Sequence, residues 1–116
     1  LKENVKILTD ENKLKGCIIN LIKNGVEATD KSAMICVKSY IENNKLLISV
    51  SNTGKPIPKE VESQLFDDGF TTKNSGSGVG LYLCKKNLEA QGGKIILKKS
   101  NKNLTEFQIL INIYKD

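Results

Sequence analysis

The stretch FTTKNSGSGVGLYLCKKNLEAQGG, residues 70–93, places three glycines at every second position, Gly76, Gly78 and Gly80, at the start of a helical-looking run. Glycine-rich turns that open a helix often hold phosphate groups, because free N–H groups and the helix dipole attract anions. A dinucleotide fingerprint would need glycine where Leu81 stands, and a P-loop would need Gly-Lys-Ser/Thr after the last glycine. The stretch alone is equally compatible with a flexible surface loop. The rest of the chain is needed to distinguish a phosphate-binding turn from such a loop.

Length and composition indicate one ordinary globular domain covering residues 1–116, with no apolar run long enough for a membrane span. The net charge of +5 comes from lysines spread along a chain without arginine and with few aromatic residues. This pattern favours a solvated surface over a nucleic-acid interface, so we expect no nucleic-acid partner. Three separated cysteines without any histidine make a zinc site unfavourable and indicate reduced, buried thiols in the cytoplasm.

The periodicity of apolar residues predicts a strand at 4–8 and a long amphipathic helix after an N-cap at Asp10. Further helices are expected at 59–66 and 79–91, the second ending at Gly92–Gly93. Two hairpins are expected, with strands at 33–42, 45–52, 94–100 and 104–114, the first turning at Asn43–Asn44. This order predicts an α+β fold in two layers, in which helices cover one face of a mixed, mostly antiparallel sheet.

Two polar patterns suggest a site. Asn20, Asn24 and Glu27 lie at positions i, i+4 and i+7 of the long helix and form a stripe that borders its apolar face. One amide oxygen of such a stripe would suffice for a magnesium ion that also takes phosphate oxygens. In SNTGKPIP, residues 51–58, Gly54 would let a flat ligand approach the backbone, and Asn52 could pair with a purine amine. Locally, ordinary surface asparagines and a simple turn remain alternatives.

Taken in order, these motifs resemble the catalytic and ATP-binding domain of bacterial sensor histidine kinases, in the superfamily that includes Hsp90, gyrase and the mismatch-repair ATPases. NLIKNGVEA (20–28) is similar to the N box, and NTGKPIP (52–58) takes the place of the first glycine box. LFDDGFTTK (65–73) is similar to the F box and GSGVGL (76–81) to the second glycine box. The resemblance implies the two-layer α/β sandwich called the Bergerat ATP-binding fold, with a mobile ATP lid at about 67–77.

The resemblance also implies ATP and Mg²⁺ as cofactors. It assigns the magnesium ion to Asn24, the phosphates to Asn20 and Lys73, and the support of the adenine-binding side chain to Thr105. Phe66 and Phe70 would anchor the lid, and Gly76, Gly78 and Gly80 would form its hinge and phosphate cradle. The implied ATP-binding residues are Asn20, Asn24, Glu27, Asn52, Gly54, Ile57, Phe70, Thr71, Thr72, Lys73, Gly76, Gly78, Val79, Gly80, Leu81 and Thr105.

Some positions depart from the family pattern. The first glycine box usually reads Asp-x-Gly-x-Gly, whereas this chain has Asn52 and Pro56. Loss of the carboxylate weakens the hydrogen bond to the adenine amine by about 1 to 2 kcal/mol, so we expect weaker adenine binding. Asn20 replaces the glutamate that serves the superfamily's hydrolases as general base, which disfavours an ATPase and an anti-sigma-factor kinase.

The chain has no histidine that could accept a phosphoryl group and no arginine that could act as a finger in cis. We therefore expect a fragment of a longer sensor kinase that binds Mg-ATP and presents the γ-phosphate to a histidine on a separate dimerisation domain. A response regulator would act downstream, and no catalytic residue is assigned within this chain. The domain itself is expected to be monomeric, away from the membrane, and cytoplasmic even if the full protein is membrane-anchored.

Two other functions remain open. A non-catalytic module of the same fold could sense nucleotide or dock partners, and the Asn52 departure supports this alternative. A basic binder of nucleic acid or anionic surfaces rests on net charge alone, and its affinity would fall steeply with salt.

Overall fold

The computed structural model describes residues 7, 10–27, 34–54, 56–67, 80–102 and 104–113. Its helices are α1 (Glu11–Glu27), α2 (Lys59–Glu62) and α3 (Gly80–Ala90). Its strands are β1 (Ile35–Glu42), β2 (Lys45–Asn52), β3 (Lys94–Ser100) and β4 (Thr105–Asn112). No helix in this described part of the chain is long and apolar enough to cross a membrane.

The four strands form one sheet in the order β1-β2-β4-β3, and each pairing is antiparallel. The two hairpins are thus joined through β2 and β4. The predicted turn at Asn43–Asn44 is confirmed, since both residues have positive φ, at 54° and 63°, as a two-residue hairpin requires. The predicted strand at 4–8 lies outside the described residues except for Ile7, which forms an isolated antiparallel bridge with Ile113.

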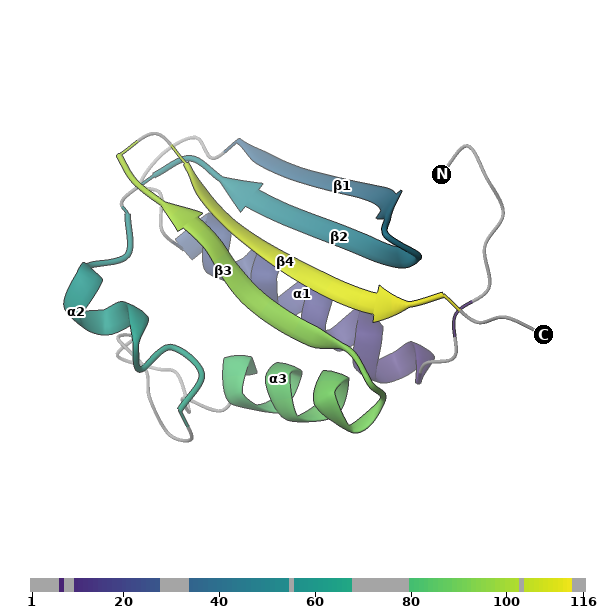
Figure 1. Cartoon of the computed structure of the whole chain (residues 1–116). Coiled ribbons are helices and arrows are strands. Elements are labelled where there is room, and N and C mark those ends of the chain that lie inside the picture. The colour runs from purple at the N-terminus through teal and green to yellow at the C-terminus, as the bar shows by residue number, and fades with distance from the viewer. Residues whose placement is uncertain are drawn as a thin grey trace.

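Helices α1 and α3 cover one face of the sheet, which confirms the two-layer arrangement (Figure 1). Alternate residues of β2 and β4 point into the core, in keeping with the two-residue period of a strand. Ile109 at the centre of the sheet is fully buried, and each such side chain contributes about 1.5 to 3 kcal/mol. The buried core residues include Cys17, Leu21, Leu46, Ile48, Val50, Cys84, Leu88, Phe107, Ile109 and Ile111.

On the opposite face of the sheet, polar side chains of neighbouring strands form hydrogen bonds with one another. Ser49 Oγ donates a hydrogen bond to Glu106 Oε2 at 2.5 Å. Gln108 Nε2, on β4, donates to Tyr40 Oη on β1 at 2.7 Å, so these side chains reach across β2. Ser49 and Gln108 are therefore buried on a face that no helix among the described residues covers.

The ends of the long helices are held by specific hydrogen bonds. Asp10 Oδ1 accepts from the Lys13 N–H at 3.1 Å, which confirms the predicted N-cap of α1. Helix α3 ends with Gly92 at a φ of 80° and the Gly93 N–H bound to the Leu88 carbonyl at 2.8 Å, which confirms the glycine cap. The Asp10 N–H also donates to Gln91 Oε1 at 2.7 Å, so the start of α1 is tied to the end of α3.

All three cysteines are free thiols. Cys17 on α1 and Cys84 on α3 are buried and hydrogen-bonded to each other, whereas Cys36 on the edge strand β1 is only half-buried. The hydrogen bond with Cys17, together with burial, raises the pKa of the Cys84 thiol well above its ordinary value. The prediction of buried thiols therefore holds for two of the three.

This arrangement predicts selective thiol labelling. A disulfide reagent at about pH 8 should modify Cys36 readily and leave Cys17 and Cys84 intact until denaturant is added, because only an accessible thiolate reacts. Absorbance of the released leaving group measures the number of reactive thiols. A Cys36→Ser variant is the control and should show almost no fast reaction. Fast reaction of two or three thiols in the native protein would contradict the packing of α1 against α3.

Candidate functional site

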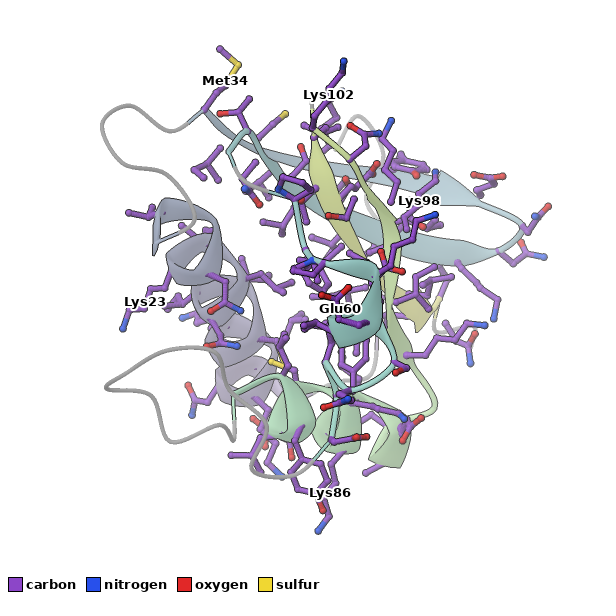
Figure 2. The ribbon with its side chains drawn as sticks, turned by 90° about the vertical axis from the view of Figure 1, so that its left-hand side faces the viewer. Lys23, Met34, Glu60, Lys86, Lys98 and Lys102 are labelled. Atoms are coloured by element: carbon purple, nitrogen blue, oxygen red, sulfur yellow. The ribbon has the colours of Figure 1, made fainter. Side chains whose placement is uncertain are left out.

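The described residues of the predicted site lie toward one end of the molecule. Figure 1 shows that α1 ends, α3 begins, β2 and β3 end and β4 begins at this end, next to α2. Figure 2 views it directly, with Glu60 of α2 toward the viewer and Lys23 projecting from α1 away from the sheet. Lys86 also projects outward, and Lys98 is exposed on β3, so these lysines add positive charge to the surface that attracts anions at long range.

The first part of the site is the contact between Asn20 of α1 and Gly80 at the start of α3. A Cβ on Gly80 would lie 2.7 Å from Asn20 Oδ1 and 2.8 Å from Nδ2, so a side chain there would displace the amide. Asn20 Nδ2 is buried without an oxygen acceptor among the described residues, and the polar group that its amide meets is the Cys84 thiol, which is a weak acceptor. Such an unsatisfied donor costs about 1 to 3 kcal/mol unless a ligand supplies an acceptor. This end of α3 thus offers both an amide donor and helix N–H groups.

The second part of the site is formed around Asn52, the last residue of β2. Its side chain is buried, and Nδ2 donates to the Thr53 carbonyl at 2.8 Å. Gly25 of α1 packs directly on it, since a Cβ there would lie 3.0 Å from Asn52 Cβ and 2.9 Å from Ile35 Cδ1. Asn52 is also the cross-strand partner of Thr105, which is buried on β4. The structure therefore brings Asn52 and Thr105 together on neighbouring strands.

The loop after β2 closes this part of the site. Gly54 has a φ of 127°, which an L side chain rarely adopts, so glycine is required at this turn. The Ile57 N–H donates to Ser100 Oγ at 2.8 Å, and Ser100 Oγ lies 2.9 Å from Thr105 Oγ1 in a further hydrogen bond. The loop is thereby attached to the ends of β3 and β4.

The remaining predicted residues are placed as follows. Asn24 lies one turn after Asn20 on α1 and is half-buried, as is Leu81 on α3. Phe66 packs edge-on against Phe107, with ring centroids 6.3 Å apart. Glu27 ends α1, but its side chain is outside the described part. Also outside the described residues lie Phe70, Thr71, Thr72, Lys73, Gly76, Gly78, Val79 and the lid segment 68–77.

The donors at this end are hard oxygen and nitrogen groups of asparagine, serine and threonine. The described residues contain no cluster of three or more His, Cys, Asp or Glu side chains that could hold a metal ion by themselves. Mg²⁺ usually keeps several waters and takes a few protein oxygens together with phosphate oxygens. The side chains present therefore suit a magnesium ion that arrives with a phosphate ligand.

Two residues of this site were not predicted from the sequence. Ser100 ends a lysine-rich strand, and no periodic signal distinguishes it from a surface serine. Gly25 continues the apolar spacing of α1, and only its tertiary contact with Asn52 gives it a role at the site. A glycine inside an otherwise regular helix was the available signal, because such a residue costs about 1 kcal/mol relative to alanine.

A family model and a curated relative each match nearly the whole chain. Residues 9–115 match the family model described as "Histidine kinase-, DNA gyrase B-, and HSP90-like ATPase". Sporulation kinase C of Bacillus subtilis is 31% identical over 107 residues, which are 92% of this chain and 25% of that kinase. The chain thus spans about a quarter of that relative's length.

The solved structures that resemble this chain include those of a histidine kinase. The catalytic domain of the histidine kinase ThkA in a nucleotide-free form has a TM-score of 0.80 and 36% identity, covering 91% of this chain and 70% of that one. The histidine kinase ThkA in complex with the response regulator protein TrrA has a TM-score of 0.71 and 35% identity, covering 88% of this chain and 29% of that one. The predicted fold is therefore confirmed.

The close approach of α1 to the sheet predicts opposite effects of the same substitution at two positions of one helix. Gly25→Ala should lower the free energy of unfolding by about 1 to 3 kcal/mol, because the methyl group overpacks against Asn52 and Ile35. Gly16→Ala is the control and should raise it by about 0.5 to 1 kcal/mol, because nothing lies within 4 Å of the new Cβ. Urea unfolding measures both. Equal stabilisation by the two changes would contradict the contact.

Proposed function

The chain belongs to the histidine kinase-, DNA gyrase B-, and HSP90-like ATPase family, and we propose that it binds Mg-ATP and presents the γ-phosphate to a histidine on a separate dimerisation domain. The prediction of a histidine-kinase-type ATP-binding domain is confirmed by the family match and by the similar kinase catalytic domains. The nucleotide contacts, the magnesium site and the phosphoryl transfer are proposals. The observation that carries them is the buried Asn20 Nδ2 beside the start of α3, which has no oxygen acceptor among the described residues.

On the phosphate side, Asn20 Nδ2 donates to a phosphate oxygen and so gains the oxygen acceptor that it lacks among the described residues. The free N–H groups at the start of α3 and the positive end of its dipole add to this attraction. Asn24, one turn further along α1, supplies the amide oxygen for magnesium, and the ion when bound neutralises phosphate charge. We assign Lys73 and the lid at about 67–77 to the same phosphates.

On the base side, Asn52 is the residue that recognises adenine. Its Nδ2 is already used by the Thr53 carbonyl, so Oδ1 is the atom that accepts from the exocyclic amine of the base. Thr105, its cross-strand neighbour, holds this arrangement, and Gly54 allows the loop to turn over the base. An amide accepts more weakly than the aspartate usual in the family, so the affinity for ATP is lowered without being lost.

In the proposed reaction, the γ-phosphate of the bound ATP is transferred to a histidine on another domain. Asn20 is an amide and cannot take a proton from water, so bound ATP is protected from hydrolysis at this position. The chain contains no histidine, so the acceptor must be supplied from outside it. Because ThkA, at 35% identity, was solved with a response regulator, we also propose such a regulator as the downstream partner, in the cytoplasm.

The proposed transfer is tested by incubating the chain with γ-labelled ATP, Mg²⁺ and the histidine-bearing dimerisation domain of the full-length protein. Label should appear on the dimerisation domain and be released by acid, as expected of phosphohistidine. The same domain with its histidine changed to alanine is the control. Binding of ATP without any transfer would contradict the kinase assignment and favour a nucleotide-sensing module of the same fold.

The magnesium assignment predicts that Asn24→Ala lowers ATP affinity by about tenfold or more when Mg²⁺ is present, equivalent to about 1.4 kcal/mol. In the presence of chelator the variant and the wild-type protein should bind ATP equally weakly, because the lost oxygen acts only through the ion. Isothermal titration calorimetry measures both conditions. Asn12→Ala, an exposed change on the same helix, is the matched control. An Asn24→Ala variant with undiminished magnesium dependence would remove Asn24 from the metal site.

A further inference from the structure

Ile57 is the one residue in the described segment Pro56–Ile57–Pro58 that carries a backbone N–H. Pro56 and Pro58 lack this donor, since their nitrogens are closed into rings. The Pro58 carbonyl is used by α2, where it accepts from the Val61 and Glu62 N–H groups. The Ile57 N–H does not enter that helix and instead donates to Ser100 Oγ at 2.8 Å. One serine hydroxyl therefore holds this part of the loop.

Ser100 is directed toward the site by an irregularity in β3. Leu97 pairs with Phe107 and Lys99 with Glu106, so one extra residue is accommodated between them. Along a regular strand, Leu97 and Ser100 would face opposite sides of the sheet, because successive side chains alternate. The bulge reverses the alternation and places Ser100 opposite Thr105, on the inner face. Bulges commonly redirect a side chain in this way next to functional sites.

The redirected hydroxyl completes a polar row across the end of the sheet. Asn52 pairs with Thr105, and Thr105 pairs with Ser100, so the three side chains lie on neighbouring strands of one face. Ser100 Oγ accepts from Ile57 and also shares a hydrogen bond with Thr105 Oγ1 at 2.9 Å. Asn52 and Thr105 are buried, and Ile57 packs against the hydrophobic core. A change at Ser100 therefore reaches the Ile57 loop and Thr105 together.

We propose that Ser100 is a positioning residue for adenine recognition, which fixes Ile57 and Thr105 relative to Asn52 and so sets the selectivity of the site for the base. It contacts no phosphate in this scheme. The inference rests on the proposed nucleotide function and adds to it a residue that acts through its neighbours. Its effect should therefore appear in binding of the base and not in binding of the polyphosphate.

Ser100→Ala should weaken binding of ATP and ADP by the same factor, about fivefold, which corresponds to one neutral hydrogen bond. The preference for ATP over GTP should fall, whereas binding of inorganic tripolyphosphate with Mg²⁺ should not change. Ser100→Thr keeps the hydroxyl and suits a strand, so it should restore the affinity for ATP. Calorimetric titrations of the three proteins with these ligands provide the comparison.

A measurement without ligand separates positioning from general stability. In the nucleotide-free protein, hydrogen exchange of the Ile57 amide should be accelerated by Ser100→Ala, because the amide loses its acceptor. Ser49→Ala is the matched control: it also removes a hydrogen-bonded strand serine, but one bound to Glu106 on the opposite face. It should leave Ile57 exchange and ATP affinity unchanged, even where it lowers stability.

The outcomes are distinguishable. If the wild-type protein binds ATP, and Ser100→Ala binds it with unchanged affinity and unchanged preference over GTP, the inference is wrong while the proposed function stands. The inference is also overturned if Ser49→Ala weakens ATP binding as much as Ser100→Ala does. If the wild-type protein binds no adenine nucleotide, the proposed function fails and the inference fails with it.

Discussion

The site depends on how closely α1 packs against the end of the sheet. Gly25 allows the helix backbone to lie directly on Asn52 and Ile35, where even one methyl group would come within 3.0 Å of both. Five residues earlier on the same helix, about 7 to 8 Å along its axis, Asn20 meets the start of α3 at Gly80. One rigid helix thus sets the separation between the part of the site assigned to the base and the part assigned to the phosphates.

The buried polar groups of the sheet and the buried amide of Asn20 differ in how well their hydrogen bonds are satisfied. The core beneath it is apolar and closed, and the outer face of the sheet satisfies its buried polar groups through Ser49, Gln108 and their partners. The exception among the buried side-chain atoms of the described residues is Asn20 Nδ2. In the proposed function, a phosphate oxygen supplies the acceptor that this amide lacks beside the start of α3.

Local signals in the sequence predicted most of the fold. The apolar spacing of α1, the Asn43–Asn44 turn and the glycine end of α3 each reflect short-range physics, and the structure confirms them. The helix stripe and the strand-end turn made Asn20 and Asn52 candidates, but their roles, and that of Thr105, came from the resemblance, because asparagine and threonine at these spacings are not distinctive alone. Ser100 could not be predicted, since the bulge between Leu97 and Lys99 shifts the phase of β3 without a sequence signal. The half-buried position of Cys36 likewise follows from its edge strand.

The central claim is that Mg-ATP binds at the end of the sheet between Asn20 and Asn52. An NMR titration of the isotopically labelled protein with Mg-ATP tests it most directly, with Mg-GTP as the comparison. The account predicts that the largest amide shift changes fall on Asn20, Gly25, Asn52, Ile57 and Gly80, and that GTP produces much smaller ones. Absence of shifts with ATP, or shifts centred on the outer face at Tyr40, Ser49 and Gln108, would contradict it.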